Sequence, residues 1–270
     1  MLKRFRSGAF WAVFGDLSRQ TPSARRRSTP AASTIALLLT LLVLPACGRS
    51  TTPADAVQGG DPVTPPPAAT PAQTPAPAPT AARARIVVLG DSLAAGLGLS
   101  ANQAFPAILQ EKIDAAALPF EVVNAGVSGD TSASGVRRLD WALTGDVRIL
   151  VVELGANDGL RGLPVEELRR NLTAIVQEAR RRGLSVVLCG MEAPPNFGAR
   201  YTDAFRQVYV DLAREHDLAF VPFLLNGVAG LPTLNQGDGI HPNEKGARLV
   251  ADTVWAVLRP VIDTRLSSSS

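Results

Sequence analysis

The sequence predicts one three-layer α/β domain with a mainly parallel sheet. From Arg85 onward, short runs of Val, Leu and Ile alternate with longer amphipathic runs, which is the pattern of strands followed by helices. The short runs are almost continuously apolar, as in strands that helices cover on both faces. The expected strands are Ile86–Leu89, Phe120–Val123, Ile149–Leu154, Ser185–Leu188 and Ala219–Phe223.

Amphipathic segments between these strands predict helices on both faces of the sheet. Pro164 suits the first position of one helix, and Glu166 and Glu167 favour its positive end. Gly183 is placed to end that helix. We expect Ser267–Ser270 to be a frayed tail. The predicted helices are Phe105–Ala117, Ser132–Leu143, Pro164–Arg182, Ala199–His216 and Glu244–Leu258.

Residues 1–46 have the composition of a leader for export. A basic segment, Arg25–Arg27, precedes the apolar run Ile35–Leu44, which is shorter than the roughly 20 apolar residues that span a bilayer. The run ends in Leu44-Pro45-Ala46-Cys47, which resembles the processing site of bacterial lipoproteins, and Cys47 is the expected lipidation site. Because Pro45 departs from the residue usual there, ordinary cleavage nearby and an uncleaved anchor remain alternatives.

Residues 47–84 are expected to form a linker, and residues 85–266 the folded domain, followed by the tail 267–270. Much of the linker consists of Pro, Ala and Thr, a composition that buries little apolar surface and favours extended, partly polyproline chain. At about 3.1 Å per residue it would let a domain lie up to roughly 100 Å from an anchor. Disorder without a tethering role is the alternative.

The excess of basic over acidic residues lies in the leader. The formal charge is +3, but residues 1–46 hold seven of the 27 basic residues and one of the 24 acidic ones. The rest of the chain has 20 basic and 23 acidic residues, a net charge of −3. No basic patch interleaved with aromatic residues follows, so we expect no nucleic-acid partner.

The two cysteines predict no internal disulfide. Lipidation of Cys47 would leave Cys189 without a partner, even in an oxidising compartment. Cys189 ends the apolar run Val186-Val187-Leu188-Cys189, so we interpret it as a buried structural thiol and not as a nucleophile.

Four polar, glycine-containing clusters are expected at one edge of the sheet. Sites in sheets of this kind form at the carboxyl ends of the strands. Three clusters directly follow predicted strands, and the fourth follows a long loop before the last helix. Their sequences are Gly90-Asp91-Ser92-Leu93, Gly126-Val127-Ser128-Gly129-Asp130, Gly155-Ala156-Asn157-Asp158-Gly159 and Gly237-Asp238-Gly239-Ile240-His241-Pro242.

Ser92, His241 and Asp238 together have the composition of a catalytic triad. A serine hydroxyl is a weak nucleophile until a base takes its proton, and histidine is the natural base near neutral pH. The spacing of Asp238 and His241 lets the carboxylate reach Nδ1 and leaves Nε2 for the serine. The only other histidine, His216, lies at a charged helix end, where the helix dipole accounts for it.

Attack on an acyl carbonyl also needs hydrogen-bond donors for the oxyanion. The candidates are the backbone N–H groups of Ser92 and Gly129 and the side-chain amide of Asn157. In isolation each of these is equally well an ordinary turn residue. Their recurrence at successive strand ends favours an oxyanion hole.

These motifs resemble those of the SGNH, or GDSL, hydrolases. Gly90-Asp91-Ser92-Leu93 resembles the GDSL block, and Gly129, Asn157 and the Asp238/His241 pair match the remaining family positions in order. The resemblance is greatest to bacterial periplasmic acyl esterases described as thioesterase, arylesterase and lysophospholipase. It extends over about Arg85 to Ile262.

The resemblance implies a flavodoxin-like fold with a five-stranded sheet, Ser92 as nucleophile, Asp238 and His241 completing the triad, and no metal or cofactor. Gly129 and Asn157 would be oxyanion donors beside the Ser92 N–H. One departure is Ala156, where close relatives often carry glycine. We interpret Asp91 and Asp158 as residues that structure the loops.

The expected function is that of an exported serine esterase of the periplasm or cell envelope. Its substrates would be acyl or aryl esters, thioesters and lysophospholipids, and partly apolar loops around Leu160–Leu163, Pro194–Gly198 and Leu224–Leu234 favour an apolar acyl group. We expect a monomer that contacts the membrane through its lipid anchor. Two alternatives are an O-acetyl esterase acting on polysaccharide or cell wall, and a non-catalytic envelope lipoprotein that binds lipid or glycan.

Overall fold

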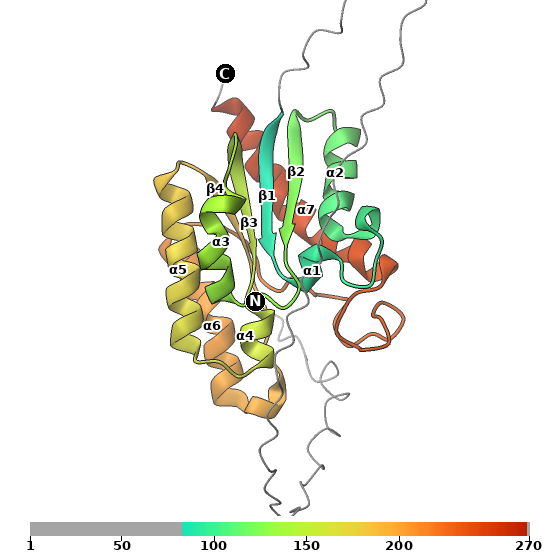
Figure 1. Ribbon diagram of the computed structural model, residues 1–270, viewed down its shortest axis with the longest axis vertical. Coiled ribbons are helices and arrows are strands. Elements are labelled where there is room, and N and C mark those ends of the chain that lie inside the picture. The colour runs from blue at the N-terminus through green and yellow to red at the C-terminus, as the bar shows by residue number, and fades with distance from the viewer. Residues whose placement is uncertain (1–82, 269–270) are drawn as a thin grey trace, which may run out of the picture. The chain divides into compact units, whose positions relative to one another are not determined.

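The fold was analysed in a computed structural model, which describes residues 83–268 (Figure 1). The leader, Cys47 and the predicted linker up to residue 82 lie outside the described residues. Five parallel strands form one sheet, as the sequence predicts, and their order in the sheet is β2-β1-β3-β4-β5. The strands are β1 (Ala84–Gly90), β2 (Phe120–Gly126), β3 (Val147–Glu153), β4 (Ser185–Cys189) and β5 (Ala219–Val221).

The strand bounds differ from the predicted ones by a few residues. β1 begins at Ala84, which the sequence assigned to the linker, and β2 continues to Gly126 because it pairs with β1 along its whole length. β5 stops at Val221 instead of Phe223. The next residue is Pro222, which has no N–H to donate to a neighbouring strand.

Helices cover both faces of the sheet, which gives the predicted three layers (Figure 1). On one face, α2 (Phe105–Ala115) packs on β2 and α7 (Glu244–Ser267) packs on β4 and β5. On the other, α3 (Ser132–Ala142) packs on β1, while α5 (Val165–Arg181) and α6 (Ala199–Glu215) pack on β4. Burial from both sides explains why Ile86–Leu89 and Ile149–Val152 are fully inaccessible to solvent.

The ends of α5 follow the sequence signals with a shift of one residue. Pro164 is the N-cap residue and not the first helical residue, and Glu166 and Glu167 lie in the first turn. The helix ends at Arg181, with Gly183 two residues beyond. The two acidic side chains thus lie at the positive end of the helix dipole.

The last helix is longer than predicted. The sequence places its end at Leu258, but α7 continues through Pro260 to Ser267, so the first residue of the predicted tail is helical. Ile262 is fully buried and Leu266 packs against the core. Packing of this last stretch offsets the hydrogen bond that Pro260 removes from the helix.

Two short helices that the sequence does not predict lie at the carboxyl edge of the sheet. α1 (Ser92–Ala95) follows β1, and α4 (Ala156–Leu160) follows β3. Figure 1 shows both at the end of the sheet toward which the strand arrows point. The described part also contains two 3₁₀ turns, η2 (Ala101–Gln103) and η3 (Pro195–Phe197).

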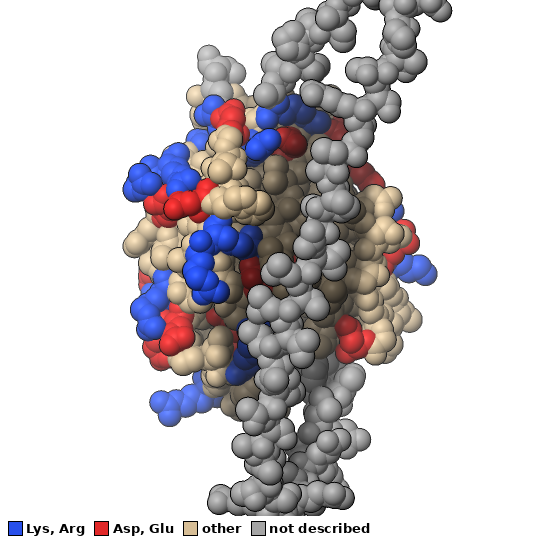
Figure 2. Space-filling model, in the orientation of Figure 1, with Lys and Arg blue, Asp and Glu red and all other residues tan. Residues whose placement is uncertain are grey.

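The visible surface shows no concentration of one sign of charge. In Figure 2, Lys and Arg side chains alternate with Asp and Glu side chains over the described residues, and many of them form ion pairs, such as Arg169 with Glu215. Within residues 83–268, no helix has both the length and the apolar composition needed to cross a membrane.

Candidate active site

The carboxyl edge of the sheet brings together the four polar clusters. Ser92 follows β1, Gly129 lies in the loop after β2, and Asn157 lies shortly after β3, in α4. The fourth cluster, with Asp238 and His241, approaches from the loop before α7. The predicted site residues therefore meet at the end of the sheet where the strand topology places them.

The turn that carries Ser92 is held by buried contacts. Asp91 is the N-cap of α1, and its Oδ1 accepts a hydrogen bond from the Leu93 N–H at 3.0 Å. A Cβ at Gly90 would lie 2.4 Å from Glu153 Oε2, so only glycine fits between β1 and this carboxyl group. The Glu153 carboxyl in turn accepts from the Asp91 N–H at 3.1 Å.

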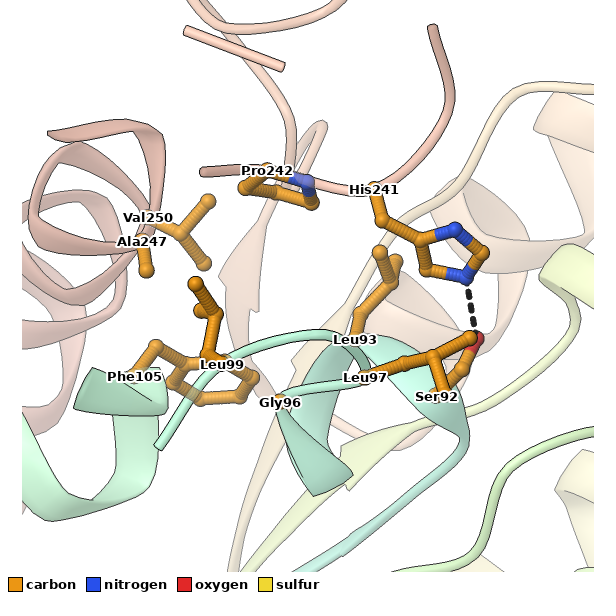
Figure 3. A pocket seen from close by; sticks show the side chains of 10 residues that line it. All are labelled: Ser92, Leu93, Gly96, Leu97, Leu99, Phe105, His241, Pro242, Ala247 and Val250. Carbon is orange, nitrogen blue, oxygen red and sulfur yellow. Dashed lines mark hydrogen bonds between the residues drawn. The ribbon is translucent and has the colours of Figure 1, made fainter. Parts of the chain in front are cut away.

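Ser92, His241 and Asp238 form a continuous hydrogen-bonded chain. The Ser92 Oγ and the His241 Nε2 are 2.9 Å apart (Figure 3). The His241 Nδ1 lies 2.6 Å from the Asp238 Oδ2. An ionised carboxylate only accepts, so the Nδ1 carries the ring proton and the Nε2 is the acceptor for the serine hydroxyl. This is the protonation state in which an imidazole takes a proton from serine.

The loop that carries the imidazole is fixed from several sides. The Asp238 Oδ1 accepts from the backbone N–H groups of Ile240 and His241, at 2.9 and 3.0 Å. The Gln236 side-chain amide donates to the carbonyls of Leu97 and Pro242, at 2.7 and 3.0 Å. The loop is thereby tied to the segment after α1, and the His241 ring is held against Ser92.

The environment of Asp238 favours its ionised form. Partial burial raises the pKa of this carboxyl, but the hydrogen bonds from the backbone and ring of His241 and from the Ile240 N–H outweigh that effect and leave the pKa below its usual value. The Asp238 side chain is 44% exposed, while the His241 side chain is 16% exposed. Asp238 is thus suited to stabilise an imidazolium without taking its proton.

Two backbone N–H groups beside Ser92 Oγ are free to bind an oxyanion. Within the described residues, neither the Ser92 N–H nor the Gly129 N–H donates to a protein acceptor. Gly129 has φ +85°, and no atom lies within 3.4 Å of the position of a Cβ, so backbone conformation and not space requires glycine here. The Arg161 side chain donates to the Gly129 carbonyl at 2.9 Å and holds the loop in place.

The side-chain amide of Asn157, the third predicted oxyanion donor, already donates hydrogen bonds to other groups. The Asn157 Nδ2 donates to the Asp130 carbonyl at 2.9 Å and to the Asp91 Oδ2 at 3.2 Å. The adjacent Ala156 has a negative φ, since the only described non-glycine residues with positive φ are Ala117 and Asp217. Alanine in place of glycine is therefore accommodated without backbone strain.

Asp158 and Asp91 both make the structural contacts expected of loop-structuring residues. The Asp158 carboxylate accepts from the backbone N–H and the hydroxyl of Ser132, at 2.8 and 2.5 Å, which joins α4 to α3. Asp91 caps α1 and also contacts Asn157. Asp91 thus supports the turn that carries Ser92 and one candidate oxyanion donor at the same time.

A pair of buried acids, Asp91 and Glu153, holds the turn that carries Ser92. Burial raises the pKa of Asp91 to about 6, although hydrogen bonds from Leu93 and Asn157 oppose that effect. Burial and the nearby Asp91 charge raise the pKa of Glu153 well above its usual value. Two adjacent carboxyl groups out of water do not readily ionise together, so burial and the Asp91 charge both favour the protonated form of Glu153.

Arg138 supports the site, and the sequence analysis does not single it out. Its guanidinium donates to the carbonyls of Gly90 and Ala125, at 2.7 and 2.6 Å, and pairs with Asp130 at 2.5 Å. It therefore ties the ends of β1 and β2 to the loop that carries Gly129. An arginine on an amphipathic helix gives no local signal of such a role, because the contacts depend on how α3 packs on the sheet.

A cavity of about 250 Å³ opens beside Ser92 and His241. Gly129 and Asn157 lie in its wall, so a carbonyl held at the free N–H groups would face into this space. Apolar side chains form much of the remaining lining: Leu93, Leu97, Ala156, Leu160, Met191, Leu225 and Ile240. The cavity suits an apolar group attached to that carbonyl.

A second, much smaller cavity of about 10 Å³ lies on another side of the Ser92–His241 pair. Figure 3 shows Phe105 of α2 and Ala247 and Val250 of α7 facing this space, with Leu97 and Leu99 between them and the Ser92 hydroxyl. It has room for about one water molecule and not for an acyl chain.

His216 and Cys189 are not part of the site. His216 is the C-cap residue of α6 and lines a surface hollow beside the start of β5, at the opposite edge of the sheet. Cys189 ends β4, is 2% exposed, and burial raises the pKa of its thiol. Among residues 83–268, no three His, Cys, Asp or Glu side chains cluster closely enough to hold a metal ion.

Comparison with known proteins identifies the family. Residues 88–249 match the model of the GDSL-like Lipase/Acylhydrolase family. The chain belongs to that family. The resemblance predicted from the four motifs is thereby confirmed, and the protein is a GDSL hydrolase.

Curated relatives of this GDSL hydrolase are esterases. Esterase TesA of Pseudomonas aeruginosa is 43% identical over 183 residues, which cover 67% of this chain and 91% of the relative. Thioesterase 1/protease 1/lysophospholipase L1 of Escherichia coli is 39% identical over 184 residues, covering 68% and 87%. An arylesterase of Vibrio mimicus is 35% identical over 171 residues, covering 63% and 86%.

Solved structures give the same result. The crystal structure of TesA is 42% identical, with a TM-score of 0.63, and covers 65% of this chain and 98% of its own. The psychrotrophic esterase EstA of Pseudoalteromonas sp., inhibited by monoethylphosphonate, is 34% identical with the same TM-score and covers 66% and 98%. The SGNH-hydrolase family esterase AlinE4 is 41% identical, with a TM-score of 0.56, and covers 66% and 96%. The predicted SGNH hydrolase fold is thus confirmed.

Proposed function

We propose that this GDSL hydrolase cleaves carboxylic esters through a covalent acyl-enzyme, with Ser92 as nucleophile, His241 as general base and Asp238 as the group that orients it. The observation that carries the proposal is the hydrogen-bonded chain from Asp238 through His241 to the Ser92 hydroxyl, with distances of 2.6 and 2.9 Å. Such a chain activates a hydroxyl that is otherwise a weak nucleophile.

In the first half-reaction, Ser92 Oγ forms a bond to the acyl carbon while its proton passes to His241 Nε2. The carbonyl oxygen becomes an oxyanion, which the N–H groups of Ser92 and Gly129 and the Asn157 amide stabilise. Collapse breaks the bond to the leaving oxygen or sulfur, which receives the proton from His241. Water then repeats the sequence on the acyl-enzyme, releases the acid and restores Ser92.

The proposed substrates have an apolar acyl chain. Support comes from the apolar side chains that form much of the lining of the 250 Å³ cavity beside Ser92. Thioesters, aryl esters and lysophospholipids enter the proposal from the names of the relatives in Escherichia coli and Vibrio mimicus. All three classes share the acyl carbon that Ser92 would attack.

A p-nitrophenyl ester series from acetate to palmitate tests the proposal with the wild-type protein and Ser92→Ala. We expect turnover to peak at short-to-medium acyl chains and to fall by about 10³-fold or more in Ser92→Ala. Ser92→Ala with unchanged turnover would refute the proposed nucleophile. Activity confined to acetate would favour the O-acetyl esterase. A folded protein inert to every ester and to a serine-reactive phosphonate would favour the non-catalytic binding protein.

We also propose that the protein is exported to the periplasm or cell envelope as a monomer, where a lipid on Cys47 tethers it to a membrane. Support comes from the basic segment, the short apolar run and the cysteine that ends it, followed by a Pro-rich linker. When cells that express the protein grow with a radiolabelled fatty acid, the wild-type chain should become labelled and the Cys47→Ser chain should not. Light scattering coupled to gel filtration measures the molar mass in solution, which should be that of one chain.

A further inference from the structure

The wall of the cavity beside Ser92 contains one carboxylate, that of Glu192. Among the described residues that line this cavity, Glu192 is the only acid, and His241 is the only other titratable side chain. Glu192 follows β4, between the buried Met191 and Ala193. It lies outside all four of the sequence clusters, and the proposed mechanism assigns it no role.

The carboxyl group of Glu192 is partly withdrawn from water and lacks a contact partner. Burial raises its pKa, and the positive charge of Arg206 on α6 opposes that effect. Because this burial acts on the ionised group, the carboxyl itself, and not only the side-chain stem, is partly desolvated. Within residues 83–268, Glu192 makes no hydrogen bond or ion pair, so no contact neutralises its charge.

The acyl group is the part of a substrate that would lie in this cavity, next to Glu192. In acyl transfer the alcohol or thiol departs, while the acyl group stays on Ser92 until water attacks. The free N–H groups fix the carbonyl oxygen, and the apolar wall, including Leu160 and Leu225, surrounds the space next to them. The Arg161 guanidinium donates to the Gly129 carbonyl nearby but is not part of the cavity lining.

We propose that Glu192 determines the charge preference of the acyl site: neutral acyl groups and acyl groups ending in a cation are accepted, and acyl groups ending in an anion are rejected. A charge that makes no hydrogen bond or ion pair, in a partly desolvated wall, attracts an opposite charge and repels a like one more strongly than it would in water, and the charge of Arg206 offsets only part of this effect. The inference rests on the proposed esterase function and adds the class of acyl group that the site takes.

Three p-nitrophenyl esters that differ in the end of the acyl chain test the inference: the neutral valerate, the anionic glutarate monoester and the cationic γ-trimethylammonium butyrate. Glu192→Gln removes the charge and keeps the shape of the side chain. At pH 8, we expect Glu192→Gln to raise kcat/KM for the anionic ester and to lower it for the cationic ester, each on the order of 10-fold. The kcat/KM for the neutral ester should stay within about twofold of the wild-type value.

Glu121→Gln is the matched control, because it makes the same charge change at the start of β2, at the other edge of the sheet. It should leave all three values unchanged. Glu192→Lys should reverse the preference of the wild-type protein for the cationic over the anionic ester. Circular dichroism and thermal unfolding verify that each variant is folded.

The possible results separate the two hypotheses. Equal changes for all three esters in Glu192→Gln, or no change, would overturn the charge preference while leaving the esterase function intact. A charge effect that appears only when the cation is moved to the alcohol, as in butyrylcholine against 3,3-dimethylbutyl butyrate, would overturn the assignment to the acyl group. Absence of Ser92-dependent hydrolysis of the neutral ester would overturn the proposed function, and the inference with it.

Discussion

The Asn157 side-chain amide donates to the Asp91 carboxylate across 3.2 Å, and this bond joins a candidate oxyanion donor to the residue that precedes Ser92. The same nitrogen donates to the Asp130 carbonyl at 2.9 Å, so both of its hydrogens are engaged. An oxyanion at Ser92 has to take over one of them. Asp91 thus orients the amide before a substrate arrives and competes with the oxyanion for it.

This relationship predicts that Asp91 and Asn157 act as a unit in catalysis. Asn157→Ala should lower kcat by about 10²- to 10³-fold, as for loss of one oxyanion donor. An asparagine at position 91 has one acceptor oxygen for the two hydrogen bonds that the Asp91 carboxylate accepts, from the Leu93 N–H and from Asn157. If that oxygen stays with Leu93, its NH₂ group faces the Asn157 amide, and we expect kcat to fall on the order of 10-fold with little change in KM. In the Asn157→Ala background the Asp91→Asn effect should vanish. Equal effects in both backgrounds would show that the two residues act separately.

Asp91 also predicts a pH dependence of stability. Its pKa is raised from 3.8 to about 6, so the folded state holds a proton that the unfolded state releases at lower pH. The stabilisation is fully present below pH 3.8 and is lost as pH rises through about 6, and the pKa difference corresponds to at most about 3 kcal/mol.

Urea unfolding of the wild-type protein and Asp91→Asn at pH values between about 4 and 8 measures this effect. As pH rises, the free energy of unfolding of Asp91→Asn should increase relative to that of the wild-type protein. Asp203→Asn, an exposed acid on α6, is the control and should follow the wild-type curve. A constant difference between Asp91→Asn and wild type at every pH would contradict the raised pKa.

Asp238→Asn tests whether the carboxylate sets the tautomer of His241. The amide oxygen of an asparagine can still accept from the N–H groups of Ile240 and His241, which the Asp238 Oδ1 now binds. Its NH₂ group would face the His241 Nδ1 and force the ring proton onto Nε2. We therefore expect kcat to fall by about 10³- to 10⁴-fold with little change in melting temperature. A loss of less than tenfold would mean that Asp238 only caps the loop.

Arg138→Lys should destabilise the edge of the sheet that carries the site. A lysine ammonium cannot reproduce the planar set of donors that contacts two carbonyls and Asp130, so at least one of these buried groups loses its partner. We expect the free energy of unfolding to fall by about 2–4 kcal/mol. Arg137→Lys is the matched control, because Arg137 is exposed on the same helix and, within residues 83–268, its side chain hydrogen-bonds only to Ser134. Equal stability of the two variants would contradict the role of Arg138.

The strands and the long helices were predictable because burial imposes a pattern on their sequences. β1 and β3 are covered on both faces and read as unbroken apolar runs, and α5 shows both its apolar stripe and its terminal signals. The short helices α1 and α4 were not predicted. Each has five residues or fewer, which is too short for a periodic pattern, and α1 depends on the cap from Asp91.

The site residues were predictable where chemistry and position coincide, and not where long-range packing creates the contact. Ser92, Gly129, Asn157 and His241 follow strands or precede a helix, so the topology alone brings them to one edge. Arg138 has no such signal, because it reaches the strand ends only through the packing of α3 beside β1. Glu192 does follow a strand at the same edge, but it lies outside the four glycine-containing clusters, so the sequence does not mark its carboxyl group as part of the site.

Pro260 is the point at which a local rule and the structure disagree, and it supports a last prediction. Proline lacks the N–H that would bond to the Ala256 carbonyl, yet α7 continues past it to Ser267, where Val261, Ile262 and Leu266 pack on the core. Pro260 is exposed, so Pro260→Ala removes little packing and restores a helical hydrogen bond. We expect the free energy of unfolding to rise by about 1–3 kcal/mol, measured in urea. Thr253→Ala raises helix propensity in the same helix and removes the hydrogen bond from the Thr253 hydroxyl to the Leu249 carbonyl, so it should change the free energy of unfolding by only about a few tenths of a kcal/mol. An unchanged or lower stability in Pro260→Ala would mean that the rigidity that proline gives the unfolded chain outweighs the missing bond.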